Sequence, residues 1–275
     1  FGGNDAAGSP SNNDVVYLNG GVIENAYGGG NQTGQTITNI YLQGAQVTKL
    51  FGGSNQSGTV NTANVYVSSG ISEYVYGGNN SGGTTRVANV TITGGTVTKE
   101  VYGGGSKADT DETHLYLGNA ILNDVYGGGE SASATTTETQ IEGATITNYY
   151  GGSNKSGTVD TTTTTMSSGT VSNIYGGNNI GGNSNTATIT IENGTIGTIY
   201  GGGNQVASSF ANININNGNI TNIFGGGNEA GLNTATINVA AGVIGNIYGG
   251  SNQSGNITKT TITTENNPTI TIDNI

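Results

Sequence analysis

Apolar and polar residues alternate with a period of two in short stretches that recur along the whole chain. Ala187, Ile189 and Ile191, for example, can point to one side while the threonines between them point to the other. This alternation is typical of a β-strand with one buried face. The same inward set recurs at 63–67, 88–92, 211–215 and 235–239. We therefore expect equivalent strands to stack around one core.

A second apolar pattern stands just before a repeated aromatic residue. Ile196 and Ile199, for example, precede Tyr200 by four residues and by one. In two units the earlier aliphatic residue is displaced by one position, to Ile71 and to Val97, which predicts a bulge in each. Helix formers are scarce and β-branched residues dominate, so each unit is expected to hold two strands.

An aromatic residue followed by two glycines appears eleven times, at steps of 24–26 residues. One such unit cannot bury its apolar face, whereas stacked units share a continuous core. The sequence therefore predicts an all-β fold, a parallel β-solenoid of eleven coils of 24–28 residues that forms a single domain over 1–275 with no evident end caps. The coils are expected to start near Phe1, Tyr27, Phe51, Tyr76, Tyr102, Tyr126, Tyr150, Tyr175, Tyr200, Phe224 and Tyr248.

The residues after each aromatic predict a sharp corner. We expect the two glycines to turn the chain there, because glycine takes positive φ without steric cost. Asparagines recur at one place of this corner, where stacked amides can bond along the rod. This set, the corner ladder, comprises Asn31, Asn55, Asn80, Asn154, Asn179, Asn204, Asn228 and Asn252.

The coil motif, as in Ile199-Tyr200-Gly201-Gly202-Gly203-Asn204, resembles that of the parallel β-helix repeat proteins of prokaryotic cell surfaces, which are adhesin-like or fibre-like stalks. The resemblance covers the whole chain. It implies an extracellular, cell-surface location and a role in display, adhesion or fibre building.

The two ends of the chain are in phase with each other. Ile272, Asn274 and Ile275 belong to a segment of the kind that precedes each aromatic, and Phe1-Gly2-Gly3 supplies the corner that should follow. Open solenoid ends present unpaired strand edges. Either these residues are a window on a longer array, or subunits stack head to tail through Phe1, Gly2, Gly3, Ile272, Asn274 and Ile275. Residues 263–268 break the coil pattern and form a junction or a lengthened loop.

Composition removes several classes of function. Seventeen acidic residues against six basic ones give a net charge of −11, which opposes binding to nucleic acid. The absence of cysteine excludes disulfides and Cys metal sites, and no apolar run is long enough for membrane insertion.

Four exposed tyrosines of one outward column, Tyr17, Tyr41, Tyr66 and Tyr116, form a stripe. In-line aromatics suit stacking on the sugar rings of surface glycans, lateral contact with another rod, or stacking on one another between coils. A neighbouring threonine column is interrupted by Asn and Tyr, so β propensity explains it better than ice binding.

Catalytic or metal-binding chemistry finds few candidates. The chain has one arginine, Arg86, and one histidine, His114. Asp109, Asp111 and Glu112 could supply oxygen ligands to Ca²⁺, but they match no ligand pattern and are typical of a solvated acidic loop. We expect no enzyme activity and no cofactor. An enzyme on this scaffold would turn over acidic polysaccharide through Asp109, Asp111 or Arg86.

Sequons place possible N-glycosylation at Asn31, Asn55, Asn154 and Asn252, all at one corner of the coil. An Asn- and Thr-rich chain generates such triplets by chance. The sequence favours a structural extracellular fibre or stalk protein that propagates end to end by self-stacking. The alternative is a glycan-binding surface adhesin that uses the tyrosine stripe.

Overall fold

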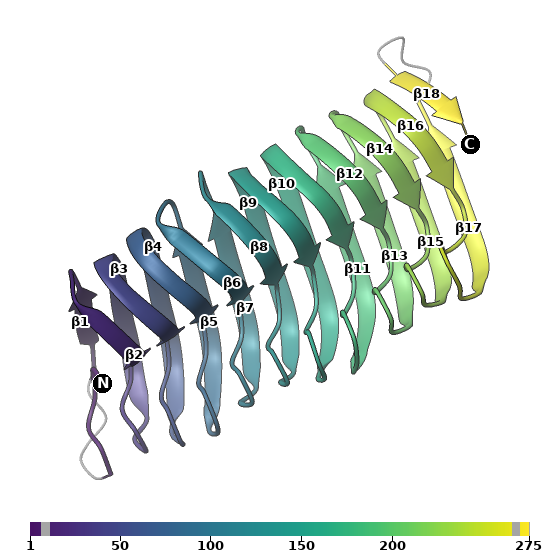
Figure 1. The fold of residues 1–275 in the computed structure, drawn as a ribbon. Helices are drawn as coiled ribbons and strands as arrows, with labels where there is room; N and C mark the ends of the chain where they lie inside the picture. Colours follow the sequence, from purple (N-terminus) through teal and green to yellow (C-terminus); the bar gives the residue numbers. More distant parts are fainter. Residues whose placement is uncertain (7–11, 266–269, 275) are drawn as a thin grey trace.

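The computed structural model describes residues 1–6, 12–265 and 270–274, which form a rod of stacked coils (Figure 1). The described residues are strands, turns and bends, without a helix, and the chain winds through about ten turns. This confirms the prediction of an all-β parallel solenoid.

Eighteen strands build the rod. Their bounds are β1 (Asp14–Leu18), β2 (Val22–Tyr27), β3 (Gln35–Phe51), β4 (Thr59–Tyr76), β5 (Thr84–Ile92), β6 (Thr96–Tyr102), β7 (Thr110–Leu117), β8 (Ile121–Tyr126), β9 (Ala134–Tyr150), β10 (Thr158–Tyr175), β11 (Asn183–Ile191), β12 (Thr195–Tyr200), β13 (Ser208–Ile215), β14 (Asn219–Phe224), β15 (Leu232–Val239), β16 (Gly242–Tyr248), β17 (Ile257–Thr264) and β18 (Ile270–Asn274).

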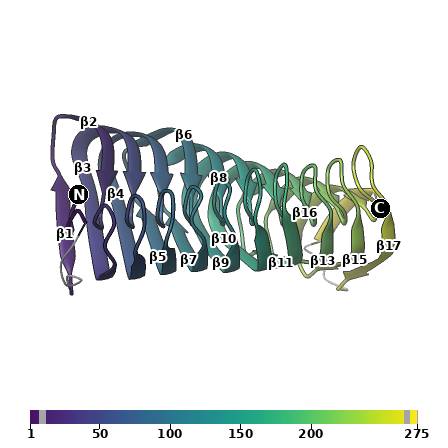
Figure 2. The ribbon, with the colours of Figure 1, turned by 90° about the horizontal axis from the view of Figure 1, so that it is seen from below.

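Each strand pairs in parallel with the equivalent strand of the next coil. β11, β13, β15 and β17 follow one another on one side of the rod, and β12, β14, β16 and β18 on another. Figure 2 shows β11, β13, β15 and β17 side by side along the axis. Like residues therefore lie opposite like residues: Ala187 faces Ala211, which faces Ala235.

The core is one continuous cluster of stacked, mainly aliphatic side chains that runs along the rod from Leu18 to Ile247. The inward residues predicted from the alternation, such as Val65, Val90 and Ile213, are fully buried. Each such side chain contributes about 1.5–3 kcal/mol when it leaves water. Because every coil repeats this set, stability is distributed evenly along the rod rather than concentrated at one place.

One of the two predicted bulges is wrong. Val97 is buried, and the pairing register shifts between Val97 and Glu100, as a bulge requires. In the preceding unit, however, Ile71 is 42% exposed and Ser72 takes the inward position, where its hydroxyl donates to the Tyr74 carbonyl at 2.9 Å. The register inherited from neighbouring coils places Ser72 opposite Val97, and it overrides the local apolar pattern.

The reason given for the paired corner glycines is also wrong. Positive φ occurs at other turns, for example at Gly58 and Gly70, and at no described glycine that directly follows an aromatic. Those glycines are required for a different reason. A Cβ atom on Gly77 would overlap the carbonyl oxygen of Gly103 in the next coil. Close approach between coils, not backbone handedness, excludes a side chain there.

Three polar side chains, those of Tyr149, Thr164 and Thr139, are buried in the middle of the core. Tyr149 stands where other coils carry an aliphatic residue, and its hydroxyl accepts a hydrogen bond from Thr164 at 3.0 Å. Thr139 lies opposite Thr164, in a column that is aliphatic in most coils. Tyr149 and Thr164 therefore form a hydrogen-bonded polar pair within a mainly apolar core.

Replacing Tyr149→Phe should destabilise the rod by about 1–3 kcal/mol, because the buried Thr164 hydroxyl loses its partner. The double variant Tyr149→Phe/Thr164→Val should recover most of that loss. Urea denaturation followed by circular dichroism measures both values. An equal loss in the single and double variants would contradict the pairing.

Alkaline pH should weaken the rod through the same residue. Burial raises the pKa of Tyr149 to about 12, from an ordinary value of 10.0. Because the folded state holds this proton more tightly, its stabilisation is complete below pH 10 and is lost as pH rises towards 12. The loss from Tyr149 alone is roughly 3 kcal/mol. Denaturation at pH 8 and pH 11.5 should show a smaller decline for Tyr149→Phe than for the parent chain.

Candidate interaction surfaces

The first coil presents an open edge at one end of the rod. In the part of the chain that the structure describes, β1 and β2 pair on one side only, with β3. Phe1 stacks on Tyr27 with ring centroids 4.8 Å apart and is itself 64% exposed. The Gly2 amide donates to the Tyr27 carbonyl at 3.0 Å, as Gly28 does to Phe51. Residues 1–3 thus occupy a normal corner whose outer face is open.

The last coil presents the opposite edge. Its strands β17 and β18 pair with β15 and β16, and Tyr248 is 44% exposed. Thr260 donates its hydroxyl to the Gly249 carbonyl of its own coil at 2.6 Å. In an interior coil the equivalent Thr113 donates to Gly127 of the following coil at 2.6 Å. Thr260 therefore uses a substitute acceptor where no following coil is described.

The last described strand and the first described residues occupy adjoining places in the coil repeat. Ile272 lies opposite Ile244 and Asn274 opposite Asn246, so β18 ends two positions before the aromatic place of its coil. For Ile272 and Asn274 the structure describes the backbone alone, and Ile275 lies outside the described residues. Phe1 holds the aromatic place. If a second copy were placed after β18, its Phe1 would therefore fall close to the next aromatic place of the repeat.

The corner ladder runs along the rod as a chain of side-chain hydrogen bonds. Each amide nitrogen donates to the oxygen of the preceding coil, as Asn80 does to Asn55 at 2.8 Å and Asn55 to Asn31 at 2.9 Å. A second run connects the remaining members over Asn154, Asn179, Asn204, Asn228 and Asn252. Each bond contributes about 1 kcal/mol and fixes the register of its corner.

The ladder is interrupted in the middle of the rod, where Ser106 and Glu130 stand in the asparagine places. Glu130 accepts hydrogen bonds from the Tyr76 hydroxyl at 3.0 Å, from Ser106 at 2.8 Å and from Lys155 at 2.7 Å. Burial opposes its ionisation, but these three donors outweigh burial and lower the pKa of Glu130 below its ordinary value. The cluster is a local replacement for the ladder.

The four sequon asparagines lie within the corner ladder. Their side-chain nitrogens, the atoms to which a glycan would attach, donate to Asp5, to Asn31, to the Tyr102 hydroxyl and to Asn228. Asn154 is moreover 3% exposed. A glycan on any of these atoms would replace a ladder hydrogen bond, so modification and the ladder compete at these positions.

The tyrosine stripe is stacked on itself. Tyr17 and Tyr41 lie with ring centroids 4.9 Å apart, and Tyr41 and Tyr66 with centroids 4.7 Å apart and planes 10° from parallel. The inner ring faces are therefore covered, and the stripe presents ring edges and hydroxyls. Tyr116 lies apart from the others, two coils beyond Tyr66, and its hydroxyl donates to Glu142 at 2.8 Å.

Exchanging all four stripe tyrosines for alanine should leave the affinity for surface polysaccharides unchanged within about twofold, because the ring faces between Tyr17, Tyr41 and Tyr66 are covered by stacking. Glycan-array binding of the variant and the parent chain checks this. The matched control is Tyr74→Ala, which removes an aromatic residue outside the stripe. A large loss confined to the stripe variant would favour the adhesin alternative.

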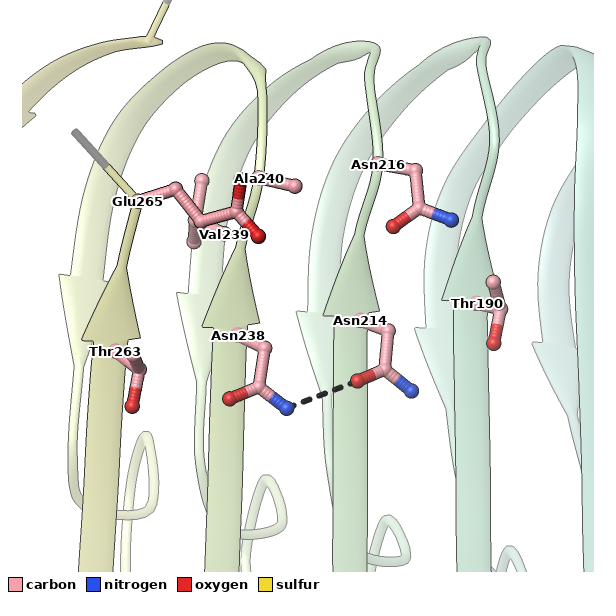
Figure 3. A pocket seen from close by; sticks show the side chains of 8 residues that line it. All are labelled: Thr190, Asn214, Asn216, Asn238, Val239, Ala240, Thr263 and Glu265. Carbon is pink, nitrogen blue, oxygen red and sulfur yellow. Dashed lines mark hydrogen bonds between the residues drawn. The ribbon is translucent and has the colours of Figure 1, made fainter. Parts of the chain in front are cut away.

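A shallow groove of about 350 Å³ crosses four coils near the C-terminal end (Figure 3). Its floor is polar: the Asn238 amide donates to Asn214 at 3.0 Å, between Thr190 and Thr263 of the same column. Glu265 closes one side. The sequence did not point to this groove, because its residues continue the outward column of the tyrosine stripe without a motif of their own.

The acidic loop does not assemble a metal centre. Asp109 accepts a hydrogen bond from the Ser133 amide at 2.8 Å, and Asp111 is exposed. Glu112 lies 3.9 Å from His114, which also contacts Glu138 at 3.3 Å. Across residues 1–6, 12–265 and 270–274, no group of three His, Cys, Asp or Glu side chains is placed to share a metal ion.

A cation–aromatic cluster on the second strands was missed in the sequence. Lys49 and Lys99 lie over the Tyr74 ring, at 5.7 Å and 5.0 Å from its centroid, and Lys99 pairs with Glu73 at 2.8 Å. The signal was present, since aligning the repeats places Lys49 and Tyr74 in one column. Three of the six cations of the chain are held at this cluster and at Glu130.

These features define a parallel β-solenoid repeat protein with open strand edges at both described ends. Comparisons with protein-family models, with curated proteins and with solved structures gave no match to the chain. No helix long and apolar enough to cross a membrane occurs among the described residues.

Proposed function

We propose that this chain is a structural fibre or stalk protein of a prokaryotic cell surface, which propagates end to end by stacking of its solenoid coils. It acts without catalysis or cofactor, as a rigid spacer. The extracellular, cell-surface location rests on the resemblance of the coil motif to that of cell-surface β-helix proteins. The role as a rigid spacer is inferred from the rod of stacked coils.

The phase of the two open edges carries the proposal. β18 ends two positions before an aromatic place, and Phe1 occupies that place in the first coil. A second copy placed on the last coil would set Phe1 against Tyr248 and continue the aromatic column. Such a head-to-tail contact does not close on itself, so it generates a filament. About ten turns at ~4.8 Å give a repeat of roughly 50 Å per copy.

The test is the intact mass of the denatured native protein combined with electron microscopy of the undenatured sample. Chains of 27.5 kDa that form thin, unbranched filaments with a ~4.8 Å axial repeat would support the proposal. Chains of that mass that remain monomeric at every concentration would contradict it. A mass several times larger would mean that further coils follow in the same polypeptide chain. The proposed joint between separate copies would then be abandoned.

The glycan-binding adhesin is the weaker alternative. It needs open aromatic faces, and the tyrosine stripe offers mainly edges because its rings cover each other. A sugar ring would find an uncovered face only at the outer side of the stack, as at Tyr17, which is 60% exposed.

A further inference from the structure

The corner ladder has a fixed direction in the first half of the rod. Its first member accepts only: the Asp5 carboxylate receives the Asn31 amide nitrogen at 2.8 Å. Because an ionised carboxylate has no proton to donate, Asn31 must turn its nitrogen towards Asp5 and its oxygen towards Asn55. Asn55 and Asn80 repeat this orientation.

The direction is fixed independently in the second half. The Tyr102 hydroxyl donates to Glu100 at 2.7 Å, so its oxygen must accept from the Asn154 nitrogen, at 2.9 Å. The oxygen of Asn154 then accepts from Asn179, and the order continues to Asn252. The last ladder residue therefore presents its amide oxygen, an acceptor, to whatever lies beyond the last coil.

Other columns of the two end faces are complementary. Tyr248 and Phe1 each leave an aromatic face open. The Thr260 hydroxyl could exchange its present acceptor for the Gly2 carbonyl of a second copy, which corresponds to Gly127 in the interior contact of Thr113. The corner ladder does not match in this way. The amide oxygen of Asn252 in one copy would meet the Asp5 carboxylate of the next copy, and both groups are hydrogen-bond acceptors.

We propose that Asp5 keeps the end-to-end joint between two copies of this chain weak and reversible, because its carboxylate faces the amide oxygen of Asn252 in the adjoining copy. This inference rests on the proposed function. Two acceptors at ladder spacing repel instead of bonding, so the joint lacks the hydrogen bond that every ordinary ladder step makes. The mismatch distinguishes the joint from an interior step and limits filament length.

The experiment compares the critical concentration for assembly of the parent chain with that of Asp5→Asn. The new amide can donate to Asn252 and extend the ladder through the joint, so the critical concentration should fall about tenfold. Light scattering and electron microscopy measure it. The matched control is Asp111→Asn, which removes one exposed acidic charge in a middle coil and should have little effect.

A second background tests the pairing itself. In Asn252→Ala the acceptor is absent, so adding Asp5→Asn should no longer improve assembly. An unchanged critical concentration for Asp5→Asn, or an equal gain from Asp111→Asn, would overturn the inference while leaving end-to-end assembly intact. If neither the parent nor any variant assembles, the proposed function fails instead, and circular dichroism confirms that each chain is folded.

Discussion

Replacing Gly103→Ala is expected to destabilise the rod by about 3 kcal/mol or more, although it adds a single methyl group. A Cβ atom there would overlap the Gly127 carbonyl oxygen of the next coil and a methyl group of Leu115. The carbonyl belongs to the backbone of a paired coil and cannot rotate away. The corner would have to open, which breaks the stacking on both sides.

Gly118→Ala is the matched control for that variant. Its added Cβ would lie 3.4 Å from the Ile92 carbonyl oxygen, an ordinary van der Waals contact. Alanine also restricts the unfolded chain, so this variant should be neutral or slightly stabilised. Urea denaturation followed by circular dichroism compares the two. Similar urea midpoints for both variants would mean that the close approach of corner glycines to the next coil does not limit how tightly the coils pack.

The coil architecture could be predicted from the sequence because each unit repeats the same physical requirements. Alternating residues such as Ala187 and Ile189 define the strand, and the aromatic-Gly-Gly step defines the coil length. A solenoid is nearly one-dimensional, so a correct unit gives the whole fold. Fold prediction therefore succeeded without any long-range pairing having to be guessed.

The individual contacts were harder to predict because neighbouring coils decide them. Ser72 is buried and Ile71 exposed because the register comes from adjacent coils, which the local pattern does not contain. The corner glycines were expected to take positive φ, whereas their requirement is clearance for the next coil. In both cases the deciding atoms lie about 25 residues away in the chain.

The candidate surfaces were predicted only as columns of residues. The sequence placed Tyr17, Tyr41 and Tyr66 in one line, but only the structure shows that their rings cover each other. The direction of the corner ladder was likewise hidden, since an amide side chain donates or accepts according to its neighbours. Asp5 and Tyr102 fix that direction. Asp5 carried no motif in the sequence, and the motif at Tyr102 predicted only the start of a coil.

Gly249→Ala is expected to weaken end-to-end assembly strongly without weakening the fold. Gly249 holds the same motif place as Gly103, but in the last described coil. Its added Cβ would meet only Thr260, with the nearest atoms at 3.5 Å, so the isolated chain accommodates it. Within the rod, a Cβ atom on Gly225 would lie only 2.8 Å from the Gly249 carbonyl oxygen of the next coil. In the proposed joint, the Gly2 carbonyl oxygen of the adjoining copy would take the equivalent position next to Gly249. The methyl group would then overlap backbone and prevent the coils from closing together.

The measurement pairs urea denaturation with filament imaging on Gly249→Ala and Gly118→Ala. Both variants should unfold at the parent midpoint, but only Gly118→Ala should assemble, and Gly249→Ala should require a concentration at least ~100-fold higher, since the clash costs about 3 kcal/mol. Filaments of parental length from Gly249→Ala would contradict stacking through this face. Because the two variants add the same methyl group, the difference between them isolates the joint from general effects of alanine.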